Sequence, residues 1–441
     1  MNIGFYAKRA AQNRTGLGNY SRFVIRILSE QFASNSYHLY TPKPHRIPIS
    51  EDTHAEEALP AFSTQRHLEQ DTVIWRVWGM THDIQQDGIN IFHGLSNELP
   101  LNIGTPQQRE TKLGEDRCKY LVTIHDLIFI HTPQYYHWID RKIYNYKFRR
   151  ACQCADRVIA VSEYTKQEIM HYYHTPEEKI DVVYQGCDPV FAQDIESSKQ
   201  EEVKQKYQLP DQYVLYVGSI EERKNLMLVA KAMAEINQMA KANEEKCNIA
   251  KIHVVAVGRR TPYVDEIQAY LKEQSIEHLF HFHHQVPYED LPSFYKLARS
   301  FTYPSRIEDF GIPLLEAITS GIPTIGCTGS CLEEAGGPGG IYVNPDDAQS
   351  MAEAIVRTCT DEQLRQDMIK AGKTYALNFT DEKLACDLMN TYEKVIRGHL
   401  QKRVDAGDPI MFSTFAPIHN ISFNIYCLSC MQDYGNKDVI I

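Results

Sequence analysis

Short apolar runs rich in β-branched and aromatic residues recur along the whole chain, and longer stretches with helical periodicity separate them. This alternation is typical of parallel sheets that helices cover on both faces. Four runs lie in the first half of the chain and five in the second, at residues 3–6, 89–93, 120–124, 157–161, 213–217, 252–257, 279–283, 300–303 and 323–326. The pattern therefore predicts an α/β chain with two open sheets.

A polar segment divides these runs into two groups. It extends from Phe191 to Pro210 and contains the charged run SSKQEEVKQK. At 441 residues the chain exceeds the size of one typical core. We therefore expect an N-terminal domain over residues 1–190 and a C-terminal domain over residues 191–384, each with its own sheet. Because ligands bind beyond the carboxyl ends of strands in open sheets, two facing sheets would form a central ligand cleft.

The segments outside these strands are less regular. Residues 42–70 and 101–117 are polar and are expected to be loops. A helix is expected from Leu384 to about His399, and residues 401–441 then lose clear periodicity. We assign no function to that tail.

The composition limits the classes of function. The formal net charge is -11, which does not suit a protein that follows a nucleic-acid backbone, because phosphate contacts require clustered Lys and Arg. The N-terminus enters the first strand without a signal-peptide pattern, and 18 consecutive apolar residues do not occur. We therefore expect a cytoplasmic protein without a spanning helix, whose eleven cysteines are mainly reduced and buried.

The most specific motif is Glu308-Asp-Phe-Gly-Ile-Pro-Leu-Leu-Glu316, which follows the strand ending at Tyr303 and opens a helix. Pro313 suits the first helical turn, where its missing N–H costs nothing. Gly311 permits a close approach of the backbone to a ligand. The motif therefore predicts a polar ligand site at the N-terminus of this helix.

The two glutamates of this motif are expected to differ in role. Glu308 lies in the loop that would face the ligand, and Glu316 lies about one turn into the helix. A carboxylate there can accept two hydrogen bonds from vicinal hydroxyls, such as those of a ribose. The main-chain N–H groups of Phe310, Gly311 and Ile312 would point from the helix N-terminus toward the same ligand. The alternative is that both glutamates are ordinary solvated charges.

A second motif, YVLYVGSIEERKNL, begins at Tyr213 and predicts a strand, a turn at Gly218, and a helix preceded by Arg223 and Lys224. Two cations at the mouth of a sheet can neutralise a diphosphate whose charge grows as a sugar–phosphate bond breaks. The alternative is that both side chains are simply solvated.

Two weaker signals lie near strand ends of the first half. Gly16 and Gly18, in the segment TGLGNY, follow the first strand and precede a helix expected to begin near Tyr20, although a flexible surface turn is an alternative. His125 follows the apolar run 120–124 in the string TIHDL. Asp126 either holds the ring of His125 or caps the following segment.

Together these motifs resemble those of the retaining glycosyltransferases of family 4, the group 1 glycosyl transferases, over about residues 1–400. The resemblance implies the GT-B fold: two facing Rossmann-like domains, an acceptor-side domain over residues 1–190 and a nucleotide-sugar domain over residues 191–384. The last helix, at about 385–400, would cross back to the first domain. The stretch RVIAVSEYTKQEI also resembles the family, with Ser162 expected to cap a helix.

The resemblance also implies the site residues. His125 and Glu308 would act on the transferred sugar as catalytic residues, and His93 would line the acceptor side. The residues expected at the donor are Gly16, Gly18, Gly218, Arg223, Lys224, Asp309, Phe310, Gly311, Ile312 and Glu316.

The expected activity is transfer of a hexose from a nucleotide-diphosphate sugar, with GDP-mannose as the first guess and UDP-glucose as the next. The acceptor would be a hydroxyl of a saccharide or a lipid-linked saccharide, as in surface polysaccharide assembly. No D-x-D triplet occurs in the chain, so we expect no metal, and no cofactor is expected. The resemblance implies that transfer retains the anomeric configuration. The alternatives are a sugar-nucleotide epimerase, a phosphorylase or a non-catalytic sugar-nucleotide-binding protein.

The helical stretch from Arg141 to Arg150 combines basic residues with tyrosines. Such a face suits peripheral contact with the inner face of a membrane that carries a lipid-linked acceptor. The alternative is an ordinary solvated helix face.

Overall fold

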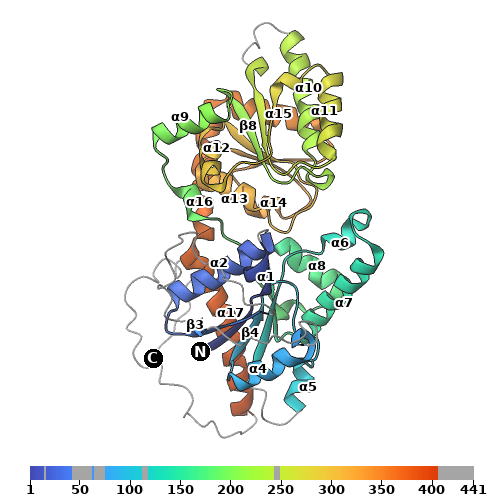
Figure 1. Ribbon diagram of the computed structural model, residues 1–441, viewed down its shortest axis with the longest axis vertical. Coiled ribbons are helices and arrows are strands. Elements are labelled where there is room, and N and C mark those ends of the chain that lie inside the picture. The colour runs from blue at the N-terminus through green and yellow to red at the C-terminus, as the bar shows by residue number, and fades with distance from the viewer. Residues whose placement is uncertain (14–15, 42–61, 64–74, 112–117, 243–248, 406–441) are drawn as a thin grey trace. The chain divides into compact units, whose positions relative to one another are not determined.

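The first sheet has seven parallel strands in the order β3-β2-β1-β4-β5-β6-β7 (Figure 1). A computed structural model describes residues 1–13, 16–41, 62–63, 75–111, 118–242 and 249–405. Residues 1–393 form one unit, which holds both sheets, and a second unit begins at Lys394. The strands of the first sheet are β1 (Asn2–Tyr6), β2 (Ser36–Tyr40), β3 (Phe62–Ser63), β4 (Ile91–Gly94), β5 (Lys119–Ile124), β6 (Arg157–Ala160) and β7 (Ile180–Val182).

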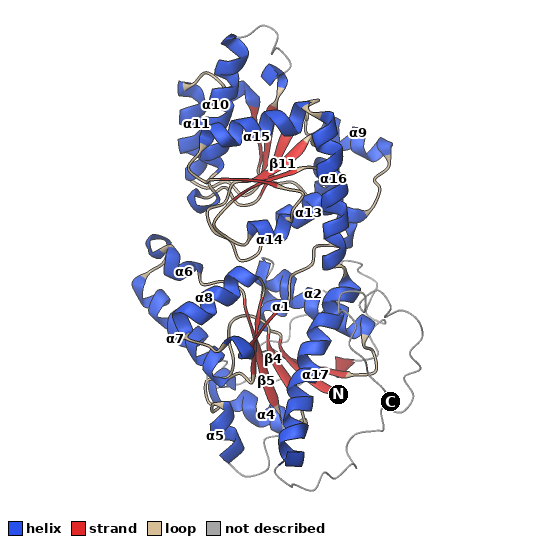
Figure 2. Ribbon diagram, turned by 180° about the vertical axis from the view of Figure 1, so that it is seen from behind, coloured by secondary structure: helices blue, strands red, loops and turns tan. Residues whose placement is uncertain are grey.

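Helices lie between most successive strands of this sheet where the connections are described, and they cover its faces (Figure 2). The helices described are α1 (Lys8–Gln12), α2 (Gly16–Gln31), α4 (Met80–Gln86), α5 (Pro106–Thr111), α6 (Ile128–His131), α7 (Trp138–Cys154) and α8 (Glu163–Tyr173). Shorter turns are the π-helical η2 (Trp75–Gly79) and the 3-10 turns η3 (Pro133–Tyr135) and η4 (Glu177–Lys179). Ser162 caps α8 as expected, because its side chain accepts a hydrogen bond from the Thr165 N–H.

The second sheet has six parallel strands in the order β10-β9-β8-β11-β12-β13. Its strands are β8 (Tyr213–Val217), β9 (His253–Val257), β10 (Phe280–His283), β11 (Ser300–Tyr303), β12 (Thr324–Cys327) and β13 (Ile341–Val343). Its helices are α9 (Ser197–Lys206), α10 (Leu226–Ala242), α11 (Tyr263–Glu273), α12 (Leu291–Leu297), α13 (Ile312–Ser320), α14 (Leu332–Gly336), α15 (Ala348–Thr360) and α16 (Glu362–Ala376). The 3-10 turns are η5 (Pro189–Ala192), η6 (Glu222–Lys224), η8 (Ile249–Lys251), η9 (Glu277–Leu279), η10 (Tyr288–Asp290) and η11 (Leu377–Phe379).

All nine predicted strands are present. Most of them are apolar runs buried on both faces, and in β5 every residue is buried, whereas in β10 only Phe280 is buried. Sequence reasoning missed β2, β7 and β13. The first contains the polar residues Ser36 and His38, and the other two have only three residues each, so neither carries a long apolar run.

Three expectations about irregular segments were wrong where the structure describes them. Residues 106–111 form α5 rather than a loop, and residues 62–63 form β3. Helix α2 begins at Gly16 rather than near Tyr20. The remainder of 42–70, residues 112–117, and the tail from residue 406 lie outside the described residues.

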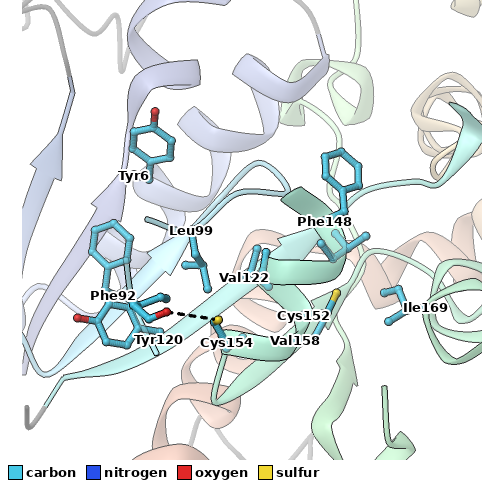
Figure 3. Packing of buried hydrophobic residues seen from close by; sticks show 14 of the residues in the cluster. Tyr6, Phe92, Leu99, Tyr120, Val122, Phe148, Cys152, Cys154, Val158 and Ile169 are labelled. Carbon is cyan, nitrogen blue, oxygen red and sulfur yellow. Dashed lines mark hydrogen bonds between the residues drawn. The ribbon is translucent and has the colours of Figure 1, made fainter. Parts of the chain in front are cut away.

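The core of the first sheet is a cluster of buried side chains (Figure 3). The C-terminal half of α7 contributes Phe148, Ala151, Cys152 and Cys154 to it. The Cys154 thiol donates a hydrogen bond to the Ile103 carbonyl at 3.5 Å. The eight cysteines described are all free and mostly buried, as expected.

Helix α17 (Asp381–Asp405) contacts the first sheet within residues 1–393. Its Tyr392 is fully buried, and the Tyr392 hydroxyl lies 2.7 Å from Nδ1 of His93 on β4. Arg26 of α2 forms an ion pair with Asp381 at 2.8 Å. Among the described residues, no helix has the length and apolar character needed to cross a membrane.

Candidate active site

The loop between β11 and α13 carries the E-x7-E motif. Gly311 caps α13 with φ 109°, a conformation that other residues rarely adopt, and a Cβ there would lie 2.8 Å from Leu332 Cδ2. Pro313 occupies the first turn of α13, as predicted. The backbone conformation therefore explains why glycine and proline stand between the two glutamates.

Glu308 is the centre of a polar cluster at the carboxyl ends of β8 and β11. Its side chain is only 5% exposed. The Glu308 Oε1 atom lies 3.0 Å from Lys224 Nζ and 3.2 Å from Arg223 Nη1. Ser305 Oγ donates a further hydrogen bond to Oε1 at 2.7 Å. The structure thus brings together three residues that the sequence predicted separately.

The surrounding charges decide the protonation of this carboxyl. Burial alone would raise the pKa of Glu308, but Lys224, Arg223 and the Ser305 hydrogen bond outweigh burial and lower the pKa to about 2. Glu308 is therefore ionised at neutral pH. Two cations share the buried Glu308 carboxylate, so these three groups together carry a formal charge of +1, while the charge of Asp309 also acts on Arg223.

The turn after β8 places the two cations. Lys224 ends the short turn η6, and Asn225 then adopts a left-handed conformation with φ 56° before α10 begins. Arg223 Nη1 also donates to the Ile307 carbonyl at 2.5 Å. Lys224 Nζ hydrogen-bonds the hydroxyl of Tyr303. Each cation is therefore held by the loop that carries Glu308.

Gly218, in the same turn, has a backbone conformation that side-chain-bearing residues rarely adopt, and its carbonyl lies against Gly258. Its φ is 152°, and its N–H donates to the Val257 carbonyl at 2.9 Å. A Cβ on Gly258 would lie 1.7 Å from the Gly218 carbonyl oxygen. The backbones after β8 and β9 thus approach each other closely, which shapes the strand ends next to the cations.

Glu316 lies one turn into α13 and is half-buried, apart from this charge cluster. Its Oε2 accepts a hydrogen bond from the Tyr295 hydroxyl at 2.6 Å. Burial raises the pKa of Glu316 to about 7; the Tyr295 hydrogen bond opposes this shift and the charge of Asp188 adds to it. The two glutamates therefore differ at neutral pH, since Glu308 is ionised and Glu316 is partly protonated.

The main-chain donors at the start of α13 do not all point toward a ligand. The Phe310 N–H donates to the Asp309 carboxylate at 2.9 Å, so donor binding by this N–H, which stays a prediction, would require that bond to be exchanged. The Phe310 ring is fully buried and packs against Tyr184 and Phe379, with centroids 5.6 and 5.7 Å away. Phe310 therefore anchors the loop.

His125 follows β5 and is 1% exposed. Its Nε2 lies 2.9 Å from the Leu95 carbonyl, and its ring meets the edge of Tyr20 at a centroid distance of 4.5 Å. Burial lowers the pKa of His125, while the Leu95 hydrogen bond and the charge of Asp309 oppose the shift. Because a carbonyl only accepts hydrogen bonds, Nε2 carries the proton and Nδ1 of the neutral ring presents a lone pair.

Asp126 does not hold the His125 ring. Its carboxylate accepts a hydrogen bond from the Ile128 N–H at 2.9 Å, so it caps the segment leading into α6, which was one of the two alternatives. Burial and then the charge of Asp309 raise the pKa of Asp126 to about 6, against the effects of the Ile128 hydrogen bond and Arg223.

The two glycines near the N-terminus stand inside the first turn of α2. A Cβ on Gly18 would lie 1.8 Å from the Asn13 carbonyl oxygen, so this position requires glycine for packing. Gly16 has no atom within 4 Å of a Cβ position. The same helix carries Tyr20, whose hydroxyl lies 3.0 Å from Thr123 Oγ1. Gly18 therefore allows the first turn of α2 to pack against Asn13.

His93 lies in the core of the first sheet, and its expected place on the acceptor side stays a prediction. It is fully buried, with Nδ1 2.7 Å from the Tyr392 hydroxyl and Nε2 2.8 Å from Thr123 Oγ1. Burial lowers the pKa of His93 to about 3, so the ring is neutral. Both nitrogens are engaged because α17 covers this strand end.

Sequence reasoning did not identify three polar residues that make contacts in this site. Ser305, Tyr303 and Tyr295 hold the two glutamates and Lys224, yet serine and tyrosine are common and these follow no motif. Within the described part of the chain, no three His, Cys, Asp or Glu side chains form a group suited to holding a metal ion.

Comparisons with known proteins identify the family. The Glycosyltransferase Family 4 model matches residues 23–191, and the Glycosyl transferases group 1 model matches residues 198–375. O-antigen chain mannosyltransferase B of Escherichia coli is 28% identical over 277 residues, which are 62% of this chain and 70% of that protein. O-antigen chain mannosyltransferase RfbU of Salmonella typhimurium is 28% identical over 236 residues, which are 53% of this chain and 59% of that protein.

A solved structure supports the same fold. Sucrose-phosphate synthase from Thermosynechococcus elongatus is similar with a TM-score of 0.68 at 19% identity, and the match covers 90% of this chain and 100% of that chain. One family model matches each of the two sheet-bearing regions. The chain is a glycosyltransferase of the GT-B fold, with a Glycosyltransferase Family 4 domain followed by a Glycosyl transferases group 1 domain.

Proposed function

We propose that the protein transfers a hexose, with retention of anomeric configuration and without a metal or cofactor, from a nucleotide-diphosphate sugar to a hydroxyl of a saccharide or lipid-linked saccharide. The observation that carries this proposal is the buried Glu308 carboxylate held between Arg223 and Lys224. Two relatives are named as O-antigen chain mannosyltransferases, which favours mannose as the transferred sugar, and we propose GDP-mannose as the donor. The reaction is proposed to take place in the cytoplasm, at or near the inner face of the membrane.

In this proposal Arg223 and Lys224 neutralise the diphosphate. Their formal charge exceeds that of Glu308 by one, so a residual positive potential remains for the leaving group. Glu308, kept ionised by the two cations, accepts hydrogen bonds from hydroxyls of the donor sugar. The cations would then take the place that a divalent ion has in metal-dependent transferases.

Glu316 is proposed to bind the ribose. Its hydrogen bond to Tyr295 occupies Oε2, so Oε1 and the remaining lone pairs are available to vicinal hydroxyls. Its separation from Lys224 and Arg223 suits binding a neutral part of the donor. Residues 191–384 would accordingly bind the nucleotide sugar, and residues 1–190 would bind the acceptor.

The proposed chemistry needs no protein nucleophile. The bond between the anomeric carbon and the diphosphate oxygen breaks, and its electron pair leaves with the diphosphate. The acceptor oxygen bonds to the anomeric carbon on the same face, and its proton passes to the departing diphosphate. The His125 Nδ1 lone pair, left available by the Nε2 hydrogen bond to Leu95, accepts a hydrogen bond from a hydroxyl of the transferred sugar.

The test is a panel of GDP-, UDP-, dTDP- and ADP-sugars, measured by thermal shift with and without EDTA. A ligand that binds only the folded state raises apparent stability by mass action. We expect GDP-mannose to stabilise the protein in the presence of EDTA, and Glu316→Ala to abolish that shift. Glu333→Ala, on α14, is the matched control and should keep it. If none of the sugars shifts the transition, the donor proposal fails.

The stereochemical part of the proposal has its own test. The anomeric configuration of the product, read from proton NMR of a reaction with a soluble saccharide acceptor, should equal that of the donor. An inverted product would overturn the proposed same-face transfer while leaving donor binding intact. Donor hydrolysis without transfer to any acceptor would contradict the acceptor half of the proposal.

A further inference from the structure

Exposed large apolar side chains concentrate in one short segment of the first half. Among the described residues nine such side chains are exposed, and six of them lie between residues 135 and 146. They are Tyr135, Trp138, Ile139, Ile143, Tyr144 and Tyr146, with Trp138 66% exposed and Tyr146 61% exposed. Scattered apolar residues are normal on a surface, but a cluster of this size marks an interaction site.

Helix α7 explains why these side chains are not in the core. Its C-terminal half packs Phe148, Cys152 and Cys154 into the cluster shown in Figure 3. Its N-terminal half extends past that core with α6, away from the strands of the first sheet (Figure 1). Ile139, Ile143 and Tyr146 recur at helical spacing, so they share one face of α7. The N-terminal half of α7 therefore has an apolar face that no described element covers.

Positive charge lies among these apolar side chains. Between residues 138 and 150 the chain has five Lys or Arg and one Asp, in a protein whose net charge is -11. Arg141, Arg149 and Arg150 donate to main-chain carbonyls, at 3.3, 3.4 and 2.9 Å, so these contacts leave their charges uncompensated. Lys142 is exposed and has no hydrogen bond or ion pair with any described residue.

A pocket of about 320 Å³ opens in the same place. Its lining includes the apolar side chains of Phe129, Ile130 and Trp138 and the cationic side chains of Arg141, Lys142 and Arg149. An apolar wall next to guanidinium and ammonium groups is complementary to an acyl chain with an anionic head group.

We propose that this α7 surface, defined by Tyr135, Trp138, Ile139, Lys142, Ile143 and Tyr146, docks the protein on a bilayer that contains anionic lipid. Aromatic side chains with a polar edge suit the interfacial region of a bilayer, aliphatic ones enter its apolar boundary, and Lys and Arg bind the head groups. A second copy of the chain fits less well, because a twofold contact would place two basic surfaces against each other.

The α7 surface follows the His125 loop in the sequence, separated from it only by α6 and the start of η3. Asp126, next to His125, caps the segment that leads into α6, and η3 then leads into α7. Docking would therefore hold the loop of His125 near the bilayer surface, where a lipid-linked acceptor resides. This connection rests on the proposed function, whereas docking itself does not.

Vesicle co-sedimentation of the full chain, without any nucleotide sugar, tests the docking. We expect binding to phosphatidylglycerol-containing vesicles that weakens as salt is raised, and little binding to phosphatidylcholine alone. Lys142→Glu should weaken the partition at least about tenfold, since each basic side chain near an anionic surface contributes about 1 kcal/mol. Trp138→Ala combined with Ile139→Ala should also weaken it, while Lys272→Glu and Leu377→Ala, both at exposed positions of the second half, should not.

Fluorescence gives a local readout of the same event. The chain has three tryptophans, of which Trp75 is buried, and Trp78 and Trp138 are 65% and 66% exposed. In a Trp78→Phe background the emission should shift to shorter wavelength when anionic vesicles are added, because Trp138 leaves water. The proposal is overturned if vesicles do not bind, if neutral and anionic vesicles bind equally, or if the α7 variants instead abolish a dimer seen in sedimentation equilibrium.

Docking and transfer can fail independently. Donor binding by thermal shift and transfer to a soluble acceptor do not involve vesicles. The Lys142→Glu variant is expected to retain both. If Lys142→Glu no longer binds vesicles but still transfers sugar to the soluble acceptor, the docking surface is supported. If the wild type binds vesicles but binds no donor, only the proposed function is contradicted.

Discussion

The ammonium group of Lys224 lies 3.0 Å from the Glu308 carboxylate, although 84 residues separate the two along the chain. They meet because β8 and β11 are neighbours in a parallel sheet, so the loops that follow them leave from the same edge. Both side chains are largely buried, at 12% and 5% exposure. An ion pair this sequestered fixes the positions of the charges before a ligand arrives, which lowers the cost of organising the site.

Lys224→Ala is predicted to lower turnover by a factor on the order of 10² to 10³, because one charge that stabilises the leaving group is lost. Arg223 continues to compensate Glu308, so the variant should remain folded. Steady-state kinetics measure the first effect and circular dichroism the second. Lys272→Ala, at an exposed position of α11, is the matched control. Unchanged turnover in a folded Lys224→Ala protein would remove the lysine from the proposed mechanism.

Glu308 is predicted to make stability depend on pH in the acid range. Its pKa falls from 4.5 in the unfolded chain to about 2 in the folded protein, so the ionised form stabilises folding. This contribution, on the order of 3 kcal/mol, is fully present above pH 4.5 and is lost as the pH falls toward 2.

Chemical denaturation of wild type and Glu308→Gln across that range measures the contribution of Glu308. The difference in unfolding free energy between the two proteins should shrink as the pH falls. A difference that does not change with pH would show that Glu308 is not held as an ionised group.

Glu316 is predicted to make donor affinity depend on pH near neutrality, and affinity should fall as the pH is lowered through 7. Its pKa is about 7, and the ionised carboxylate accepts ribose hydroxyls better than the acid. One pH unit below that pKa, only about a tenth of the carboxyls are ionised, so donor affinity should fall by roughly tenfold. Isothermal titration calorimetry of the nucleotide above and below pH 7 measures this.

The same raised pKa has a consequence for the free protein. Ionising a buried carboxyl opposes folding, so stability is lost as the pH rises from 4.5 toward 7. Glu316→Gln should therefore be more stable than wild type above pH 7, and this gain should vanish below pH 4.5. Donor affinity that is constant through pH 7 would argue against the carboxylate as the ribose acceptor.

Tyr392→Phe is predicted to destabilise the fold by about 1–3 kcal/mol, because it leaves Nδ1 of the buried His93 without its hydrogen-bond partner. The KM for the acceptor should not change, since His93 is enclosed in the core. Urea denaturation and acceptor kinetics measure the two effects. A raised acceptor KM with unchanged stability would instead place His93 at the acceptor site.

Much of this architecture is determined locally by the sequence. Most of the nine apolar runs predict their strands because a strand buried on both faces reads as a continuous apolar run, and the cap of α8 at Ser162 depends on neighbouring residues alone. Glycine and proline in the E-x7-E motif mark the loop and the start of α13 for the same reason. The positions of Arg223, Lys224, Glu308 and His125 at strand ends follow from this local pattern.

Tertiary structure determines the burial, the hydrogen-bond partners and the pKa values of these residues. His93 and His125 both stand at strand ends in the sequence, yet α17 encloses the first completely, while the second keeps one ring nitrogen without a described partner. Likewise, Glu308 and Glu316 share one motif, but two cations lower the pKa of the first and burial beside Asp188 raises that of the second. Burial and charge depend on segments distant in the chain, and a local pattern carries no information about which distant segment packs against it.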